Sequence, residues 1–410
     1  MRILFLSYYF EPDLCAGSFR NTALFKALLN QMSRDDSIHV ITTKPNRYAS
    51  YHVIGLSHEE GLNYVIDRIE TPQHASGFVD QIKSYFVYFH NCKKITKGKK
   101  YDLVYASSSR LMTAFLGKRL SAKNNCPLYL DIRDIFVDGL KRTFKKNKLI
   151  QIPLILVLTP IEKYTFRNAT HINLVSEGFN YYFSHYPKPN YSYFTNGIDD
   201  IFLEAAKEKS QHKVSKPYTI VYAGNIGSGQ GLEQVIPEAA QQLGDDYKFL
   251  LIGDGTTKAL LLKKMDELQV KNVEVLKPVS RTELIDYYKK ADYFFFHLNG
   301  EQEHLSYVLP SKMFEYGAFD IPIIAGVREY PRHFIETNMT NILLFEPGCA
   351  HELVEQIKTY PYKTEKRTIF IEKFARKAII SKMANSILEY NGGIENARDN
   401  CKKDARPYGY

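Results

Sequence analysis

The sequence lacks the motifs that identify several large classes of protein. Its five cysteines are scattered and odd in number, and none forms a CxxC pair, which argues against a disulfide framework and against a zinc site. No apolar run that we can identify approaches the roughly 18–20 residues expected of a membrane-spanning helix. There is no DxD, HExxH or GxSxG sequence, so a metal-held diphosphate, zinc hydrolysis and serine hydrolysis all lose support.

Length and composition favour two folded domains. The chain has 410 residues, well above the roughly 150 typical of one domain. Hydrophobic residues make up 44% and charged residues 24%, as in ordinary globular proteins. The opening apolar stretch is ended by Glu11-Pro12-Asp13 with no small-residue cleavage site after it, so we interpret it as a first strand rather than a signal peptide. Together with the unpaired cysteines, this predicts a cytoplasmic protein.

The net charge of +9 comes entirely from the first half of the chain. Residues 1–200 hold 26 Lys and Arg against 17 Asp and Glu, whereas residues 201–410 hold 28 of each. The densest patch leads directly into the apolar stretch 149–158, and its five cations are Lys141, Arg142, Lys145, Lys146 and Lys148. Because cations beside apolar groups are attracted to an anionic bilayer, these five are candidates for membrane contact. A solvated basic loop before a core helix is the alternative, and no recognised module supports a nucleic-acid partner.

Short apolar strands alternate with helix-period stretches along the chain, which predicts parallel sheets covered by helices. In the first half we expect strands at 2–7, 38–42, 103–106, 128–131 and 171–175, and helices at 20–31, 77–96, 111–123 and 153–168. In the second half we expect strands at 219–223, 248–253, 273–276, 293–297, 323–325 and 341–345, and helices at 231–243, 257–268, 281–291, 311–318 and 351–359. A further long helical pattern covers 367–390.

The predicted fold is therefore α/β, with two Rossmann-like doubly wound domains, residues 1–200 and 201–365. The boundary lies in the polar stretch 199–216. Residues 366–390 are expected to form a helix that packs back toward the first domain, and residues 391–410 form a polar tail.

The most informative loop is Tyr222–Gly231, between an expected strand and an expected helix. Its four glycines leave backbone amides free to approach an anion, and a helix amino terminus would add positive charge. The spacing matches neither GxGxxG nor the P-loop, which disfavours classical dinucleotide binding and P-loop chemistry. A plain strand-to-helix turn is the alternative. In such sheets ligands bind at the carboxyl ends of the strands.

Other candidates also follow expected strands. The loop Glu11–Arg20 contains Gly17, and the turn Ile252–Gly255 ends another strand. Lys312, at an expected helix start, can neutralise a phosphate, and Glu315 can accept hydrogen bonds from vicinal hydroxyls. A surface lysine and a glutamate that complements the helix dipole are the alternative.

The charged segment Asp131–Asp134 also follows a strand, so we expect its side chains to face the ligand. A salt-bridged structural corner is the alternative. From the residues alone, the sequence predicts a two-domain enzyme that binds a phosphate-bearing ligand between its domains.

Taken in order, these segments closely resemble glycosyltransferase family 4, the retaining GT-B enzymes that use nucleotide sugars. The resemblance covers roughly residues 1–390. It is carried by Tyr9-Phe-Glu-Pro12 with Gly17 and Arg20, Asp131-Ile-Arg-Asp134, Val175-Ser-Glu-Gly178, Thr195-Asn-Gly-Ile-Asp199, Tyr222-Ala-Gly-Asn-Ile-Gly227 with Gln230-Gly-Leu-Glu233, Ile252-Gly-Asp-Gly255, and Pro310-Ser-Lys-Met-Phe-Glu315 with Pro322-Ile-Ile-Ala325. The branch with this Pro-Ser-Lys motif makes bacterial surface polysaccharides such as O-antigen and capsule.

The resemblance implies a role for each matching residue. Glu315 would hold the ribose, Lys277 and Pro278 the base, and Arg133, Asp134 and Lys312 would be catalytic. The donor diphosphate would be bound by Gly17, Gly224, Asn225, Gly227, Gln230, Ser311 and Lys312. The implied ligands are a nucleotide-sugar donor, most commonly a UDP-sugar, and a lipid-linked saccharide acceptor at the inner face of the cytoplasmic membrane. No cofactor or metal is implied, because backbone amides and Lys312 would supply the positive field.

Two departures from the family pattern keep other functions open. Tyr307 stands where the first Glu of the family's E-x7-E pattern would be, and the donor loop has Asn225 and Gln230 where many members have a basic pair. A catalytically silent nucleotide-binding partner of another transferase is therefore one alternative. A nucleotide-sugar epimerase of the same architecture is another.

Overall fold

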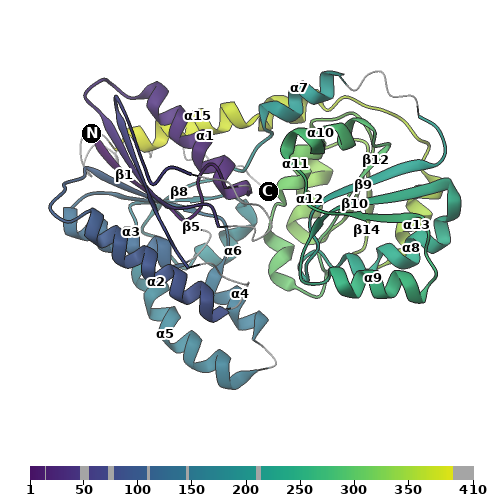
Figure 1. The fold of residues 1–410 in the computed structure, drawn as a ribbon, viewed down its shortest axis with the longest axis horizontal. Helices are drawn as coiled ribbons and strands as arrows, with labels where there is room; N and C mark the ends of the chain where they lie inside the picture. The colour runs from purple at the N-terminus through teal and green to yellow at the C-terminus, as the bar shows by residue number, and fades with distance from the viewer. Residues whose placement is uncertain are drawn as a thin grey trace. The chain divides into compact units, whose positions relative to one another are not determined.

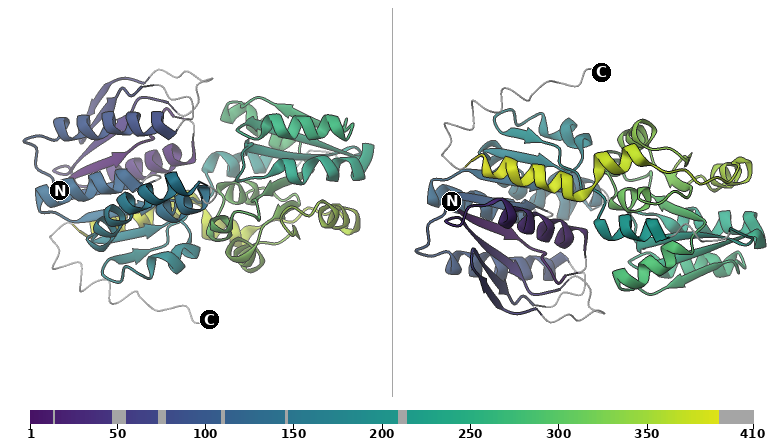
Figure 2. Two further views of the ribbon diagram at one scale, coloured as in Figure 1. Left: turned by 90° about the horizontal axis from the view of Figure 1, so that it is seen from below. Right: turned by 90° about the horizontal axis from the view of Figure 1, so that it is seen from above.

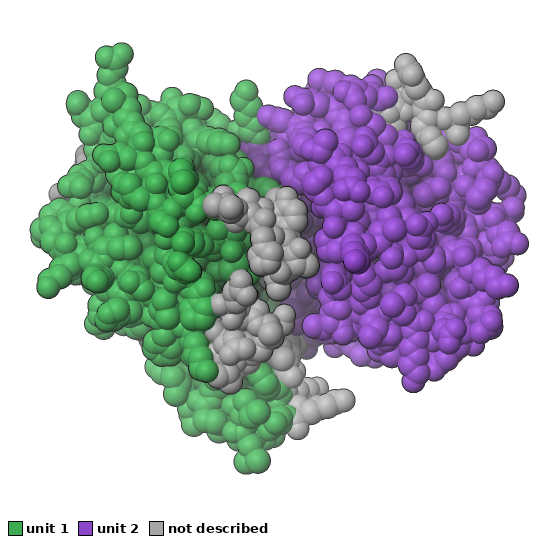
Figure 3. Space-filling model, in the orientation of Figure 1, with its two compact units in different colours: residues 1–196, 377–410 green, residues 197–376 purple. Residues whose placement is uncertain are grey.

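The computed structural model describes residues 1–13, 15–46, 55–72, 78–108, 111–144, 147–208 and 214–390, without the side chains of 78–81, 142 and 143. The chain divides into two compact units (Figures 1 and 3). Unit 1 comprises Met1–Asn196 and Lys377–Tyr410, and unit 2 comprises Gly197–Arg376. The predicted boundary, after residue 200, lies within four residues of the first crossing between units.

Unit 1 contains an eight-stranded sheet in the order β3-β4-β2-β1-β5-β6-β7-β8. Neighbouring strands are parallel except β3 and β4, which form an antiparallel hairpin at one edge. The strands are β1 (Arg2–Ser7), β2 (Ser37–Thr43), β3 (His58–Gly61), β4 (Tyr64–Ile69), β5 (Leu103–Ser108), β6 (Leu128–Ile132), β7 (His171–Leu174) and β8 (Asn190–Ser192).

Helices cover both faces of this sheet, with α1 and α15 on one face and α2, α3 and α5 on the other (Figures 1 and 2). The helices of unit 1 are α1 (Ala16–Gln31), α2 (Phe78–Ile95), α3 (Leu111–Asn124), α4 (Phe136–Thr143), α5 (Lys148–Arg167), α6 (Asn180–Phe183) and, from Lys377 onward, α15 (Arg376–Leu388). A short 3-10 helix, η1, covers Glu177–Phe179.

Unit 2 contains a six-stranded, fully parallel sheet in the order β11-β10-β9-β12-β13-β14. Its strands are β9 (Tyr218–Asn225), β10 (Tyr247–Asp254), β11 (Val273–Leu276), β12 (Tyr293–His297), β13 (Ile323–Gly326) and β14 (Ile342–Phe345). Its α-helices are α7 (Asp200–Glu208), α8 (Ile236–Leu243), α9 (Lys258–Glu267), α10 (Arg281–Lys289), α11 (Ser311–Gly317), α12 (Glu329–Asn338), α13 (Ala350–Thr359) and α14 (Thr368–Phe374). Its 3-10 helices are η3 (Leu232–Gln234), η4 (Gly244–Asp246) and η5 (Glu303–Tyr307).

The long helix expected at 367–390 is two helices. The chain leaves helical geometry at Ala375, which lies beside Ile198, and α14 ends there. The backbone of Ile198 exchanges hydrogen bonds with Phe374 and Arg376, both of 2.7 Å. These bonds hold the chain at the point where it passes from unit 2 to unit 1.

The second of these helices, α15, packs against the sheet of unit 1. Its residues Ile380, Met383, Ala384 and Ile387 follow the spacing of one helical face, and all are buried in a cluster that includes Phe5. Full burial of such apolar side chains contributes about 1.5–3 kcal/mol each for the larger ones. The C-terminal helix therefore belongs to the core of unit 1.

Several elements had weak sequence signals. Strands β3, β4 and β8 and helices α4, α6, α7 and α12 were not predicted. The edge strand β3 has the sequence His-Glu-Glu-Gly, with no apolar alternation to mark it. Helix α7 lies in the stretch interpreted as a polar boundary, but it buries Phe202 and Ala205.

Candidate functional site

Unit 2 brings Gly224, Lys312 and Glu315 together. Gly224 is the next-to-last residue of β9, and a Cβ atom built on it would lie only 2.5 Å from Cε of Lys312. The lysine side chain thus occupies the space that any larger residue at 224 would need. Because Lys312 lies in the first turn of α11, its ammonium group is held beside the carboxyl end of the central strand.

The carboxylate of Glu315 lies beside the ammonium group of Lys312. The distance from Lys312 Nζ to Glu315 Oε2 is 3.5 Å, and the side chains are 21% and 17% exposed. The hydroxyl of Tyr288 donates to the same Glu315 oxygen over 3.3 Å. The pair is therefore partly enclosed but open to a ligand, with one positive and one acceptor group facing the same region.

The glycine loop after β9 is closed by its own side chains. Asn225 Nδ2 donates to Gln230 Oε1 over 2.8 Å, and a Cβ atom at Gly227 would lie 2.4 Å from that same Nδ2. The expected helix at 231–243 begins instead with η3 and becomes α-helical only at Ile236. The prediction of an α-helix amino terminus directly after the loop was wrong, because Gly231 adopts a positive φ of 57° and starts a 3-10 turn.

Residues that the sequence analysis missed hold this loop in place. His297, at the end of β12, donates from Nδ1 to the carbonyl of Gln230 over 2.5 Å, and its Nε2 accepts from the amide of Gly348 over 2.9 Å. Asn299 and Gln302 each donate a side-chain amide to the carbonyl of Ser228 over 2.8 Å. The only available signal was the position of these polar residues directly at and after a strand end.

His297 is almost fully buried, and burial lowers its pKa to about 4. The ring is therefore neutral at physiological pH, with its proton on Nδ1 and a free electron pair on Nε2. This tautomer is the one required to donate to the Gln230 carbonyl and accept from the Gly348 amide at the same time.

The remaining predicted residues of unit 2 lie nearby in the fold but outside this cluster. Lys277 and Pro278 are exposed and directly follow the edge strand β11, and Ser311 is the first residue of α11. Across the described ranges, no side-chain hydrogen bond or ion pair joins Lys277, Pro278 or Ser311 to Lys312 or Glu315. Within the same described ranges there is also no group of three or more His, Cys, Asp or Glu side chains that could hold a metal ion.

In unit 1 the predicted residues Gly17 and Arg133 are in contact. A Cβ atom at Gly17, in the first turn of α1, would lie 1.9 Å from Nη1 of Arg133. Arg133 follows β6, and its buried Nε has no hydrogen-bond partner. The amino terminus of α1 and this guanidinium therefore form one positive region at the carboxyl edge of the sheet. Asp134, the next residue, is exposed.

Asp131, in contrast, is structural and does not face a ligand. It is fully buried, and its carboxylate accepts from Nε and Nη2 of Arg20 at 2.8 and 3.0 Å. Asn173 donates to the same carboxylate over 2.7 Å. Burial acts to raise the pKa of Asp131, but the Arg20 guanidinium outweighs it and the pKa lies below its ordinary value. The expectation that the whole segment faces the ligand was wrong for this residue.

Three of the candidate membrane residues lie on described helices, Lys141 and Arg142 on α4 and Lys148 at the start of α5. Lys141 and Lys148 are exposed. The side chain of Arg142 is not described, and Lys145 and Lys146 lie outside the described residues. The helix after them starts at residue 148 rather than 153 and is mostly exposed, so the alternative of a core helix is wrong.

Helix α5 also bears on the expectation that no apolar run approaches the length of a membrane-spanning helix. It has 20 residues, an 18-residue window with a mean hydropathy of 1.3, and only 22% of that window buried. By length and composition alone it could cross a membrane, which the sequence analysis did not anticipate.

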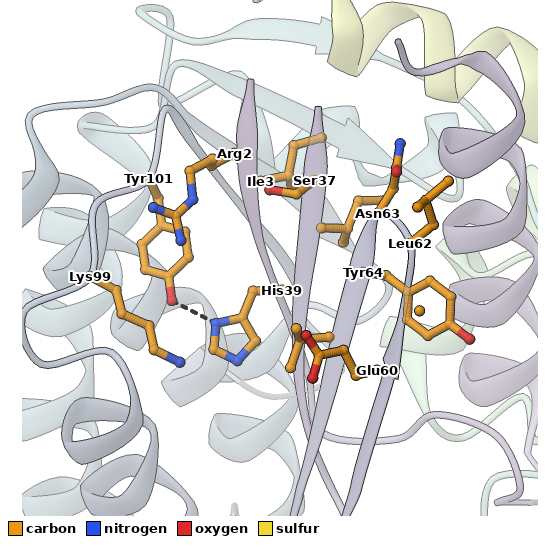
Figure 4. Close-up of a pocket in the computed structure, with 13 residues that line it drawn as sticks. Arg2, Ile3, Ser37, His39, Glu60, Leu62, Asn63, Tyr64, Lys99 and Tyr101 are labelled. Carbon is orange, nitrogen blue, oxygen red and sulfur yellow. Dashed lines mark hydrogen bonds between the residues drawn. The ribbon is translucent and has the colours of Figure 1, made fainter. Parts of the chain in front are cut away.

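A cavity of about 220 Å³ lies at the opposite, amino edge of the unit 1 sheet (Figure 4). Arg2, Lys99, His39 and Tyr101 are among its lining residues. His39 is bonded to the Tyr101 hydroxyl over 2.6 Å and to Asp67 over 2.8 Å. None of the predicted site residues lines this cavity, so it is separate from both clusters described above.

Comparisons with known proteins agree with this architecture. Residues 204–377 match the family model described as Glycosyl transferases group 1. No curated protein matches the chain. HepE from Anabaena, solved in complex with UDP-glucose, is 13% identical, with a TM-score of 0.59 and 98% of each chain covered.

Two further solved structures are similar over nearly their whole length. WaaG, a glycosyltransferase involved in lipopolysaccharide biosynthesis, is 12% identical, with a TM-score of 0.57, covering 98% of this chain and 99% of WaaG. The catalytic domain of starch synthase IV from Arabidopsis thaliana, bound to ADP and acarbose, is 13% identical, with a TM-score of 0.59 and the same coverage. These likenesses confirm the predicted α/β fold with two Rossmann-like domains. The chain has the fold of GT-B glycosyltransferases, and the part that matches the family model of the glycosyl transferases group 1 is residues 204–377.

Proposed function

We propose that this protein is a retaining glycosyltransferase of the family 4 type that transfers a sugar from a UDP-sugar to a lipid-linked saccharide in bacterial surface polysaccharide synthesis. The observation that carries the proposal is the contact of Gly224 with Lys312, together with the pairing of Lys312 with Glu315, inside the matched domain. HepE, of the same fold, was solved with UDP-glucose, and another neighbour is a lipopolysaccharide outer core galactosyltransferase, WaaB.

The donor diphosphate would bind at the carboxyl end of β9. The Lys312 ammonium group would neutralise the departing phosphate, while Gly224, Asn225, Gly227 and Gln230 bring loop amides toward it. Without a side chain at 224, the backbone leaves room for both the lysine and a phosphate oxygen. No added metal is expected to be needed, because these groups supply the positive field.

When the donor binds, the Lys312 ammonium group would leave Glu315 and pair with the diphosphate. The Glu315 carboxylate would then accept hydrogen bonds from the ribose hydroxyls. The hydroxyl of Tyr288 already fixes one carboxylate oxygen, so the group is oriented before the ligand binds. Lys277 and Pro278, after β11, would contact the base, and Ser311 would contact the diphosphate. In a retaining transfer the acceptor hydroxyl attacks on the face from which the phosphate leaves, so the main task of the protein is to orient both.

From unit 1, the positive region of Gly17 and Arg133 would bind phosphate oxygens, and Asp134 would contact the acceptor. The protein would work at the inner face of the cytoplasmic membrane, where lipid-linked acceptors are found. Lys141, Arg142, Lys145, Lys146 and Lys148 would contact its anionic surface.

A silent nucleotide-binding partner is the second candidate. It is favoured by the neutral donor loop, in which Asn225 and Gln230 bond to each other, and by Tyr307 in place of the first Glu. The two candidates differ in one measurement, release of UDP from UDP-sugars with and without membrane lipid extract. Release that requires the extract supports the transferase. Nucleotide binding with no release, whatever acceptor is offered, supports the silent partner.

A further inference from the structure

We propose that the apolar face of α5 lies within the interface of an anionic bilayer and anchors unit 1 there. This deepens the proposed function, because it rests on a membrane-bound acceptor and identifies the surface that reaches the membrane. Two features of α5 indicate this, the polarity of its exposed surface and the charges at its two ends.

The polarity of α5 is inverted relative to an ordinary surface helix. Its outward side chains are apolar and strongly exposed: Leu149 90%, Leu156 70%, Val157 60%, Ile152 54% and Ile150 43%. Of its four buried residues three are polar, Gln151, Glu162 and Thr165, and the fourth is Phe166. A surface helix in water buries its apolar stripe and exposes its polar one. The reverse arrangement fits a helix whose outer surroundings are lipid.

The buried side chains of Gln151 and Glu162 are hydrogen-bonded to other parts of unit 1. Gln151 donates to the carbonyl of Lys141, and Glu162 accepts from the Val137 amide over 3.3 Å and from the hydroxyl of Tyr182. The helix is thereby fixed to α4 and α6 by hydrogen bonds. It can meet a bilayer without leaving unit 1. Among the described side chains of α5, the Thr159 hydroxyl is the polar group that is buried without a hydrogen-bond partner.

The exposed residues of α5 form an apolar segment with charged residues at both ends. From residue 149 to residue 160 every exposed side chain is apolar. Lys148 precedes this segment, and Lys163, Tyr164 and Arg167 follow it, all exposed. In the part of the chain that the structure describes, Lys163 and Arg167 take part in no ion pair. Cations and an aromatic ring at the ends of an apolar surface are typical of a helix at a membrane interface.

The length of the apolar segment indicates that α5 lies in the interface and does not span the bilayer. At 1.5 Å per residue, residues 149–160 extend over about 18 Å, against about 30 Å for the hydrocarbon core. Cations at both ends then lie at the same depth, among the headgroups. They also disfavour a second copy as the occupant, because antiparallel pairing through this face would oppose Lys148 of one copy to Lys163 and Arg167 of the other.

The first test measures binding of the full chain to vesicles of phosphatidylcholine with phosphatidylglycerol. In the test variant Leu149, Ile152, Leu156 and Val157 are all changed to Gln. In the matched control four apolar residues exposed elsewhere, Leu62, Leu260, Leu262 and Ile369, are changed to Gln. At about 0.5 M salt, where surface charge is screened, the test variant should lose at least about tenfold in partitioning, and the control should stay within about twofold of wild type.

Equal partitioning of the test variant and wild type would overturn the proposal. So would a wild-type dimer that the test variant converts to a monomer with no change in vesicle binding, because a second copy would then be the occupant. The UDP-induced thermal shift should be the same in both variants. Its absence in wild type would contradict the donor site and leave the membrane result intact.

A second measurement uses the absence of tryptophan from the sequence. The variant Leu156→Trp carries the only indole, and its emission should shift to the blue with vesicles and be quenched by lipids brominated on the acyl chains. Leu62→Trp is the control, with no shift expected. An unshifted, unquenched Leu156→Trp would overturn insertion even if the protein folds normally.

Discussion

The two units hold their ligand-side loops by different means. In unit 2 the glycine loop is fixed by neutral hydrogen bonds from His297, Asn299 and Gln302. In unit 1 the segments around α1 are held by the buried ion pair of Arg20 and Asp131, with Arg20 also donating to the carbonyl of Phe194. The difference shows that a charged residue in the first turns of a helix has no fixed role: Arg20, in α1, is structural, whereas Lys312, in α11, lies beside the glycine loop.

The largest effect should come from breaking the ion pair of unit 1. Arg20→Met leaves the Asp131 carboxylate buried and uncompensated, which should cost about 3–5 kcal/mol of unfolding free energy. This loss of unfolding free energy can be measured by urea unfolding. The double variant Arg20→Met with Asp131→Asn should recover part of the loss. An undiminished stability of the single variant would mean that the pair does not hold unit 1 together.

Removing the lysine of unit 2 should affect catalysis and leave the fold intact. Lys312→Ala should cost about 2–4 kcal/mol in the transfer step, the range for loss of one group that stabilises developing charge. The matched control is Lys271→Ala, an exposed lysine of the same unit. Turnover of Lys312→Ala equal to that of the control would remove this residue from the mechanism.

His297 in unit 2 and His171 in unit 1 are both buried, and both should make stability depend on pH. Burial lowers the pKa of His297 to about 4 and that of His171 to about 3, below the ordinary 6.5. Between pH 6.5 and these values the unfolded chain binds the proton first, so stability should fall as the pH falls. Each histidine should contribute roughly 1 kcal/mol per pH unit in that window.

Urea unfolding between pH 7 and pH 4.5 tests this linkage. His297→Gln should flatten the pH dependence, and so should His171→Gln, each relative to wild type. A variant with the same slope as wild type would show that the histidine it replaces is not buried in its neutral form.

The smallest predicted effect concerns the amide that ties the donor loop. Asn299→Ala removes the hydrogen bond to the Ser228 carbonyl, at a cost of about 1 kcal/mol. Because the loop, not the core, is loosened, the loss should show as about fivefold weaker nucleotide binding with little change in melting temperature. The reverse pattern would assign Asn299 to the fold alone.

The alternation of strands and helices, and the position of the candidate segments after strands, could be predicted from the sequence because apolar strands alternate regularly with helix-period stretches. The contact of Lys312 with Gly224 could not, since they are 88 residues apart and only the sheet brings them together. The ion pair of Arg20 with Asp131 could not be predicted for the same reason, because the two residues are far apart in the sequence. The local sequence shows Asp131 only as a charged residue at the end of an expected strand. The inverted polarity of α5 could not be predicted, because an apolar run such as Leu149–Leu158 has the same sequence pattern in a protein core and at a membrane.

The account depends most on the donor site of unit 2, and a thermal-shift comparison tests it directly. UDP, GDP, ADP and dTDP are added to wild type and to Lys312→Ala, with and without EDTA. At about 100 times its dissociation constant a ligand stabilises the fold by about 2.7 kcal/mol, which is readily detected. The account predicts a selective shift with UDP that survives EDTA and shrinks in Lys312→Ala. No shift with any nucleotide, or the same shift in Lys312→Ala, would contradict it.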